Sequence, residues 1–202
     1  MVGLRERKKQ QTRQDIFDAS QRLFARHGFD AVTVAQIAEA ANVSAMTVFN
    51  YFPTKEDLFF GGMQFFEEQL VDAVRDRPRG ESALKAFQRR VLQGAENLES
   101  RARAEAILRA SHMVESSPAL QARERQIVDR YTDRLAEILP GGIEARVAAA
   151  AMMTAHRALV ADTRRQVAAG RRGAALAAEF RAQARRAFAR LERGLGTYAR
   201  LS

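Results

Sequence analysis

Cysteine is absent from the 202 residues of this chain, and so is tryptophan. Without cysteine the chain has no disulfide framework, no thiolate metal ligand and no cysteine nucleophile. No run of residues approaches the ~20 apolar residues that a membrane-spanning helix requires. The N-terminal segment MVGLRERKKQ is charged and lacks the apolar stretch of a secretory signal. We therefore expect a cytoplasmic protein without membrane spans.

Proline and glycine are also scarce, with four and twelve residues, and strong helix formers such as Ala, Leu, Arg, Glu and Gln dominate the chain. We find no convincing stretch of the alternating pattern that is typical of strands. The few helix-breaking residues divide the chain into about nine helices. These helices are predicted at residues 8–27, 34–41, 45–51, 55–76, 82–98, 101–115, 118–139, 143–169 and 174–195. The sequence therefore predicts an all-α fold.

The net charge of +9 favours polyanionic partners in principle, but its distribution does not point to a DNA-binding region. Residues 164–200 hold ten Arg residues against two Glu residues, so most of the excess charge lies near the C-terminus. This arginine-rich segment is a candidate for binding acidic partners. A solvated helix face with local ion pairs is the simpler interpretation.

Residues 33–52, TVAQIAEAANVSAMTVFNYF, carry the pattern of a helix-turn-helix. Thr33 and Gln36 are spaced as a capping box at the start of a short helix. Asn42 suits the left-handed conformation of a sharp turn, and Ser44 suits the N-cap of a second short helix. Such a pair can place its second helix in the major groove of DNA. A helical hairpin used only for packing is the alternative.

The second helix of this motif supplies most of the residues that we expect to contact DNA. Asn50 and Thr47 are suited to read base edges, and the methyl groups of Ala45 or Thr47 are suited to contact thymine. Tyr51 and Lys55 are expected to bind phosphates, which set position and not sequence. The complete set of predicted contacts is Thr33, Ser44, Ala45, Met46, Thr47, Phe49, Asn50, Tyr51 and Lys55.

Basic residues at the N-terminus form a second group of candidate DNA contacts. They are Arg5, Lys8, Lys9 and Arg13. Lysine and arginine bind phosphates in a salt-dependent manner, and basic arms enter the minor groove in some proteins. A solvated, frayed terminus is the alternative. We predict that loss of these charges makes DNA binding less dependent on salt.

A wider set of residues accompanies the motif. It comprises Ile16, Ala19, Leu23, Phe24, Gly28, Phe29, Thr33, Val34, Ile37, Ala38, Ala41, Val43, Ser44, Thr47, Tyr51, Phe52, Lys55, Leu58 and Phe59. With these residues, and above all with the segment YFPTKEDL, the stretch from Thr12 to Leu58 closely resembles the DNA-binding domain of TetR-type regulators. Phe49 departs from the family pattern because it stands where a phosphate-binding Tyr is usual. Asn42 replaces the usual Gly, which the turn tolerates.

The resemblance implies two domains. A helix-turn-helix head of three helices would occupy residues 1–55, and a helical body for ligand binding and dimerisation would occupy residues 56–202. TetR-type proteins dimerise through their last two long helices, and most are repressors that release DNA when a small molecule binds. We therefore expect a homodimeric, ligand-released repressor of an inverted-repeat operator. An activator or a corepressor-dependent regulator of the same fold is the alternative.

The body carries weaker signals for an effector site and a dimer interface. Candidates for an effector site are polar or polarisable residues on apolar helix faces, with aromatic residues as walls. They are Phe66, Phe87, His112, Met113, Tyr131, Met152, Met153 and His156. The two helices expected at the dimer interface contribute Val147, Ala151, Thr154, Ala158, Phe180, Ala184, Phe188 and Leu191. Ordinary core packing is the alternative for the effector-site candidates.

The sequence contains no pattern typical of an enzyme. Its Ser, His and acidic residues are not spaced as a catalytic triad, and it lacks a P-loop, a dinucleotide-binding fingerprint and paired metal motifs. We therefore expect no enzymatic activity, no cofactor and no metal. The expected partners are double-stranded operator DNA at the nucleoid, an unidentified small-molecule effector and a second copy of the chain.

Overall fold

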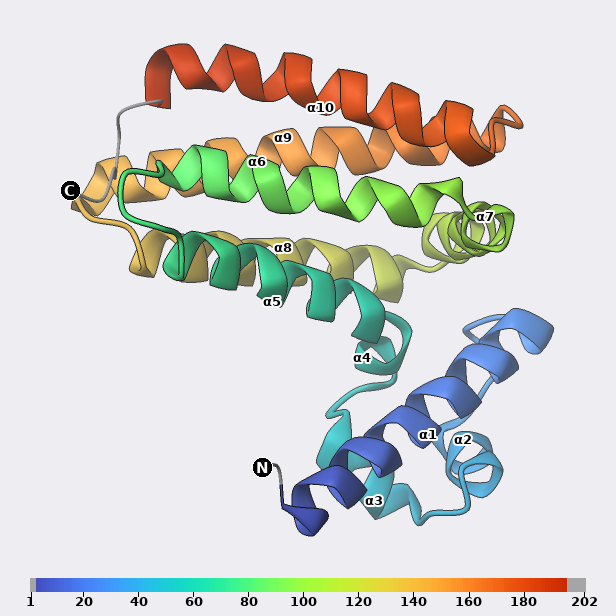
Figure 1. The fold of residues 1–202 in the computed structure, drawn as a ribbon. Helices are drawn as coiled ribbons and strands as arrows, with labels where there is room; N and C mark the ends of the chain where they lie inside the picture. Colours follow the sequence, from blue (N-terminus) through green and yellow to red (C-terminus); the bar gives the residue numbers. More distant parts are fainter. Residues whose placement is uncertain (1–2, 196–202) are drawn as a thin grey trace. The chain divides into compact units, whose positions relative to one another are not determined.

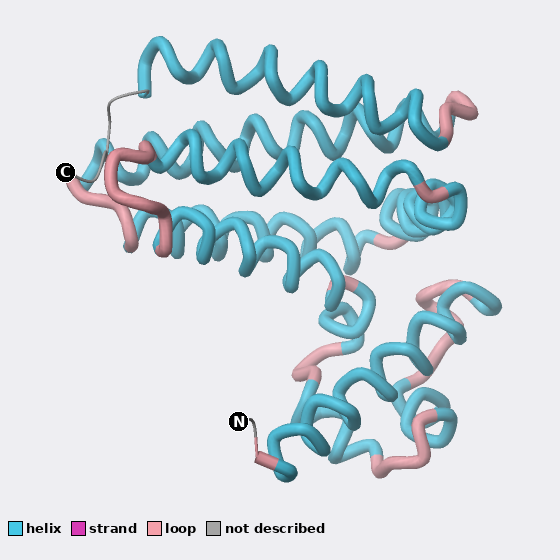
Figure 2. The backbone as a smooth tube through the Cα atoms, viewed as in Figure 1, coloured by secondary structure: helices cyan, strands magenta, loops and turns pink. Residues whose placement is uncertain are grey.

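A computed structural model of the chain describes residues 3–195. Within that range the backbone consists of helices joined by short turns, and it contains no strand (Figure 2). This confirms the predicted all-α fold. The chain divides into two compact units. The head unit contains the residues up to Gln64 together with Met113–Glu124, and the body unit contains Phe65–His112 and the residues from Arg125 on.

The head unit begins with four helices (Figure 1). They are α1 (Leu4–His27), α2 (Val34–Ala40), α3 (Ala45–Tyr51) and α4 (Lys55–Phe59). Their core side chains, which include Ile16, Ile37, Val48 and Leu58, are fully buried. Each such side chain contributes roughly 1.5–3 kcal/mol through its removal from water. Helices as short as α2 and α3 are therefore stabilised by this packing and not by their own length.

The helix predicted at residues 55–76 is in fact two helices. α4 ends at Phe59, and α5 (Gly61–Arg75) begins after Phe60. A Cβ atom built on Gly61 would lie 2.8 Å from the ring of Phe17, so a larger residue here would have to displace that ring. Gly61 and Gly62 are also poor helix formers, which explains why the helix breaks here.

The remaining part of the head unit is the junction between α7 (Arg101–Ser116) and α8 (Pro118–Glu137). α8 begins at Pro118, where the sequence analysis places the start of this helix, and Ser117 precedes it. The buried hydroxyl of Ser117 donates a hydrogen bond to Asp30 Oδ1 at 3.3 Å. The compact head unit therefore extends beyond the boundary expected at residue 55, because α4 and the α7–α8 junction pack within it.

The body unit holds the remaining helices. They are most of α5, α7 and α8, together with α6 (Ala83–Gln93), the 3-10 helix η1 (Gly94–Glu99), α9 (Gly142–Ala168) and α10 (Gly173–Leu195). α10 packs along α9, η1 and α6 (Figure 1). The single helix predicted at residues 82–98 is divided at Gly94, whose backbone lies against the ring of Phe66. No helix between residues 3 and 195 is long and apolar enough to cross a membrane.

Candidate DNA-binding interface

The two helices of the predicted motif have the caps that the sequence indicates. Thr33 Oγ1 accepts a hydrogen bond from the main-chain N–H of Gln36 at 3.3 Å, and Gln36 Oε1 accepts one from the N–H of Thr33 at 2.8 Å. This reciprocal pair is the capping box of α2. At the start of α3, Ser44 Oγ accepts a hydrogen bond from the N–H of Thr47 at 3.0 Å. Each N-cap contributes about 1 kcal/mol to the stability of its helix.

The turn between α2 and α3 is formed at Asn42. With a φ of 53°, Asn42 is the one non-glycine residue of positive φ between residues 3 and 195. The N–H of Val43 then donates to the carbonyl oxygen of Ala38 at 2.9 Å. Asparagine enters this conformation at low cost, so its replacement of the family's glycine leaves the turn intact. The helix-turn-helix geometry is therefore confirmed.

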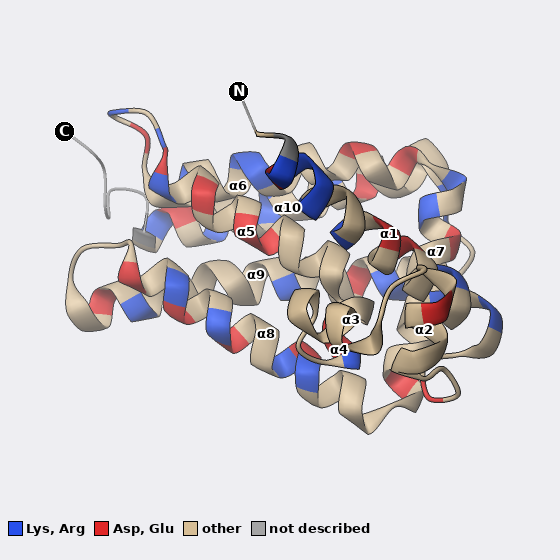
Figure 3. Ribbon diagram, turned by 90° about the horizontal axis from the view of Figure 1, so that it is seen from below, with Lys and Arg blue, Asp and Glu red and all other residues tan. Residues whose placement is uncertain are grey.

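α3 buries one face and exposes the other. Val48 is fully buried at the centre of the inner face, and Thr47 and Tyr51 are half-buried. The exposed residues are Ala45, Met46, Phe49 and Asn50. α3 carries no charged side chain, so it shows neither blue nor red in Figure 3. The outer face therefore offers apolar contacts and amide hydrogen bonds, which are suited to the edges of bases.

Ser44 and Thr47 form a second contact beyond the cap. Their hydroxyl oxygens lie 2.8 Å apart, so they share a hydrogen bond. Ser44 therefore orients the hydroxyl of Thr47 at the start of α3. Thr33, the third hydroxyl residue predicted to contact DNA, is exposed but is engaged with Gln36.

Lys55 is held by the protein itself. Its ammonium group donates hydrogen bonds to the carbonyl oxygens of Phe29 at 3.0 Å and Val32 at 3.1 Å. It also lies 4.2 Å from the centre of the Phe29 ring, a cation–π distance. These contacts use two of the three N–H donors of the ammonium group, so one remains for the predicted phosphate contact.

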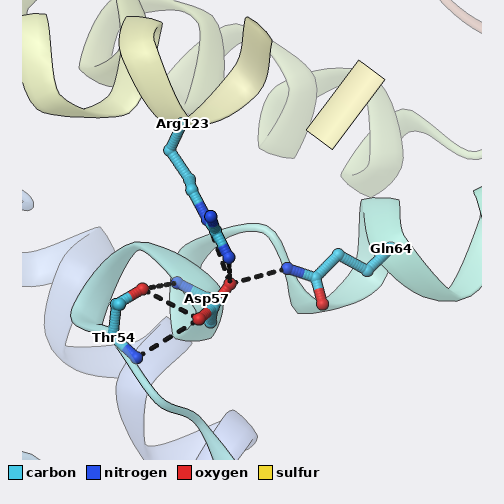
Figure 4. Close-up of polar contacts among 4 residues, drawn as sticks. All are labelled: Thr54, Asp57, Gln64 and Arg123. Atoms are coloured by element: carbon cyan, nitrogen blue, oxygen red, sulfur yellow. Dashed lines mark hydrogen bonds and ion pairs between the residues drawn. The ribbon is translucent and has the colours of Figure 1, made fainter. Parts of the chain in front are cut away.

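Asp57 is the buried polar centre of the first turn of α4 (Figure 4). Its carboxylate accepts hydrogen bonds from the N–H of Thr54 at 3.2 Å and from the hydroxyl of Thr54 at 2.9 Å. Gln64 Nε2 donates at 2.9 Å, and Arg123 Nη2 donates at 2.6 Å. The sequence carries one local signal for this arrangement, the spacing of Thr54 and Asp57 as a capping box.

The environment of Asp57 keeps its carboxyl group ionised. Burial on its own would raise the pKa of Asp57. The hydrogen bonds from Arg123, Thr54 and Gln64 outweigh burial, so the pKa lies below its usual value. Asp57 therefore carries its negative charge at neutral pH and pairs with Arg123.

The basic arm is helical. α1 begins at Leu4, so Arg5, Lys8 and Lys9 lie in its first turns, where they are exposed. Figure 3 shows basic residues in blue at this end of α1. The guanidinium of Arg13 lies 5.0 Å from the centre of the Phe52 ring. α1 therefore begins one turn before the start predicted near residue 8, because the residues before it also favour a helix.

The residues predicted for an effector site do not form one site. The ring of Phe66 stacks on His156 with centroids 5.6 Å apart, and Phe87 lies edge-on to His156 at 6.3 Å. Burial lowers the pKa of His156 to about 4, so its imidazole is neutral at pH 7. His112, in contrast, is exposed, and Met113 belongs to the head unit.

The other predicted effector residues are buried in the body unit. They are Tyr131, Met152 and Met153. The guanidinium groups of Arg130 and Arg134 lie 5.2 and 5.3 Å from the centre of the Tyr131 ring. Arg134 also pairs with Glu68 at 2.6 Å. An open hollow of about 440 Å³ lies elsewhere, and it is lined by Arg165, Gln166, Ala169, Arg171, Glu179 and Gln183. None of the predicted effector residues lines this hollow.

The residues predicted for the dimer interface on α9 share an outward face. Val147 is 59% exposed, Thr154 and Ala158 are exposed, and Ala151 is half-buried. Ile143 extends this face by one turn toward the start of α9 and is also exposed. The face is uncharged and consists mostly of small side chains, which allow a second helix to approach closely.

The residues predicted for the interface on α10 are less exposed than those on α9. Ala184 and Phe188 are at most 1% exposed within the single chain, and the Phe188 ring lies 6.0 Å from that of Phe87. The assignment of Ala184 and Phe188 to the dimer interface is therefore wrong, because they pack in the core of their own chain. Phe180 and Leu191 are half-buried.

Residues 16–61 match the sequence profile described as "Bacterial regulatory proteins, tetR family". The chain is also 33% identical over 145 residues to the HTH-type transcriptional regulator TcmR of Streptomyces glaucescens. That match covers 68% of this chain and 62% of TcmR, so the chain spans less than two thirds of this relative.

The fold is shared with solved structures at lower identity. NalD, the secondary repressor of the MexAB-OprM multidrug efflux pump in Pseudomonas aeruginosa, has a TM-score of 0.55 and 19% identity over 93% of this chain and 96% of NalD. SmeT in complex with triclosan has a TM-score of 0.53 and 15% identity over 93% of this chain and 91% of SmeT. The profile covers the same residues that form the capped helix-turn-helix. Through this domain the chain is similar to the TetR family of bacterial regulatory proteins.

Proposed function

We propose that this protein is a transcriptional repressor that binds an inverted-repeat operator as a homodimer. The observation that carries the proposal is the outer face of α3, where Met46 and Asn50 are exposed on a helix fixed by the Ser44 cap. The amide of Asn50 can pair two-fold with adenine, and Met46 offers apolar surface to thymine methyl groups. We prefer repression because it does not require a surface that recruits polymerase. A transcriptional activator with the same DNA-binding head is the alternative. Because the operator is part of the chromosome, we also expect the protein at the nucleoid.

Selection of bound duplexes from random-sequence DNA tests this proposal. We expect an inverted repeat whose half-sites lie about one helical turn (10–10.5 base pairs) apart, because a two-fold dimer presents α3 to successive major grooves. The selection is made near physiological salt, where non-specific binding is weak. Failure to enrich any sequence with folded, dimeric protein would contradict the proposal.

The dimer that we propose pairs the uncharged face of α9 with the same face of a second copy. This face, formed by Val147, Ala151, Thr154 and Ala158, is accessible in the single chain. An arginine in place of Ala158 would introduce a charge and a long side chain into a closely packed interface. Sedimentation of the Ala158→Arg variant should show a monomer at concentrations where the wild type is dimeric. Ala102→Arg, at an exposed position of α7, is the matched control and should remain dimeric.

We also infer that the body unit binds a small-molecule effector at His156. Its neutral imidazole offers one hydrogen-bond donor and one acceptor, and the rings of Phe66 and Phe87 provide apolar contact. An uncharged, largely apolar molecule with one polar group fits this chemistry. SmeT, which shares the fold, binds triclosan.

A thermal-shift screen of such compounds tests the effector site, because a ligand that binds only the folded state raises the melting temperature. The increase should be smaller in His156→Phe, which keeps an aromatic ring and removes the polar atoms. A compound that binds should also weaken operator binding, by the same factor by which the operator weakens compound binding. A compound that binds at His156 and leaves operator affinity unchanged would exclude release by that compound.

A further inference from the structure

The first turn of α4 lies directly after α3 in the chain. Thr54, the N-cap of α4, is three positions beyond Tyr51, the last residue of α3. Both the N–H and the hydroxyl of Thr54 donate to the carboxylate of Asp57. Asp57 therefore holds Thr54 in place, and Thr54 lies in the short segment that follows the last residue of α3.

Arg123 holds this carboxylate from α8. Its Nε and Nη2 atoms lie 3.2 and 2.6 Å from Asp57 Oδ1 (Figure 4). The Asp57 side chain is 7% exposed and that of Arg123 is 23% exposed, so water screens the pair only weakly. An unpaired charge in such a position is costly, which keeps the two groups together.

The same segment of the head unit contacts the other end of the helix-turn-helix. Ser117, at the start of α8, donates to Asp30, and Asp30 precedes α2 in the chain. Asp57 follows α3. Two residues of the α7–α8 junction, Ser117 and Arg123, therefore hold the helix-turn-helix on both sides.

We propose that Arg123 is a positioning residue for operator binding, which holds α3 through Asp57 in the orientation that fits the major groove without touching DNA itself. Base recognition requires hydrogen bonds of narrow geometry, so a small rotation of α3 weakens several contacts at once. The inference rests on the DNA-binding function proposed above. It adds a residue more than 60 positions beyond the helix-turn-helix to those that determine affinity.

Titration of the selected operator with Arg123→Ala tests the inference. We expect operator affinity to fall by about tenfold. Changes of this size are typical of mutations that modulate a binding site without contacting its ligand. The slope of log affinity against log salt should equal that of the wild type, because no phosphate contact is lost. A slope smaller by about one would make Arg123 a phosphate ligand and overturn the inference.

Arg125→Ala is the matched control. It removes the same charge from an exposed position of the same helix, two residues further on. This variant should bind the operator as the wild type does. Equal affinity of the Arg123→Ala and Arg125→Ala proteins would overturn the inference. Arg123→Lys keeps the charge but not the paired N–H geometry, and it should bind with intermediate affinity. If Arg123→Ala does not fold, Arg123→Lys provides the test. An Arg123→Lys protein that binds the operator as tightly as the wild type would overturn the inference.

Amide hydrogen exchange without DNA gives an independent result. In folded Arg123→Ala, the amides of residues 54–59 should exchange faster than in the wild type and in Arg125→Ala, because α4 has lost its buried charge pair. Unchanged exchange there would overturn the inference. If the wild type selects no operator, the proposed regulator function fails, and the exchange experiment still decides whether Arg123 holds α4.

Discussion

The ammonium group of Lys55 lies 3.0 Å from the carbonyl oxygen of Phe29 and 4.2 Å from the centre of the ring of the same residue. With its second hydrogen bond, to Val32, it connects the start of α4 to the turn that precedes α2. A residue that the sequence predicts to bind phosphate therefore also stabilises the head unit.

Lys55→Met should lower the free energy of unfolding by about 1–3 kcal/mol, because two charge-assisted hydrogen bonds are lost while the apolar part of the side chain is kept. Chemical denaturation of the folded protein measures this change. Unchanged stability together with a salt slope of DNA binding smaller by about one would mean that Lys55 acts only on phosphate.

Asp57 should make the free energy of unfolding depend on pH in the acid range. Its pKa is lowered in the folded state, so the ionised carboxylate stabilises the fold above the unfolded pKa of about 4, and this stabilisation is lost as the pH falls through the lower folded pKa. Asp57→Asn should be less stable than the wild type at pH 7 and should lose less stability between about pH 5 and pH 2.

Urea denaturation across this pH range measures the effect. Glu68, whose pKa is lowered by its hydrogen bond from Arg134, remains in both proteins. The difference between the wild type and Asp57→Asn therefore isolates the contribution of Asp57. Parallel pH profiles for the two proteins would contradict the role of the Asp57–Arg123 pair in stability.

Features that depend on neighbouring residues were predictable from the sequence. The capping box of Thr33 and Gln36, the turn at Asn42 and the start of α8 after Ser117 are of this kind, because each depends on residues a few positions apart. Contacts between distant segments were not predictable. Arg123 and Asp57 are 66 positions apart, and no periodicity in the sequence relates them.

The apolar stripe of α10 shows a further limit. Amphipathic spacing predicts that a face is buried, but it does not identify the surface that buries it. Phe188 was predicted at the dimer interface from its place in this stripe. In the structure it packs against Phe87 of α6.

Replacement of Phe49 by tyrosine should strengthen operator binding. It is 46% exposed on α3, where the family usually has a phosphate-binding tyrosine. Phe49→Tyr should raise operator affinity by about fivefold, which corresponds to one hydrogen bond of about 1 kcal/mol. The salt slope should not change, because the hydroxyl is uncharged. Phe65→Tyr, at a 63% exposed position in the body unit, is the control and should leave fluorescence-anisotropy titrations unchanged.

The basic first turns of α1 should contribute to the salt dependence of binding. Replacement of Arg5, Lys8 and Lys9 by alanine should reduce the slope of log affinity against log salt by about one for each residue that contacts a phosphate. Alanine preserves the helix. The matched control replaces three exposed arginines of α10, namely Arg185, Arg190 and Arg193. A slope that changes equally in both triple variants would show a general charge effect and not a DNA contact by α1.

The most direct test of operator reading by α3 is a titration of wild-type and Asn50→Ala proteins against the selected operator and its single-base-pair variants. Wild-type protein should discriminate at one position of each half-site by about 1–3 kcal/mol through Asn50. Asn50→Ala should lose the preference at that position and keep it at the others. An Asn50→Ala protein that discriminates as the wild type does at every position would contradict recognition of the operator through the outer face of α3.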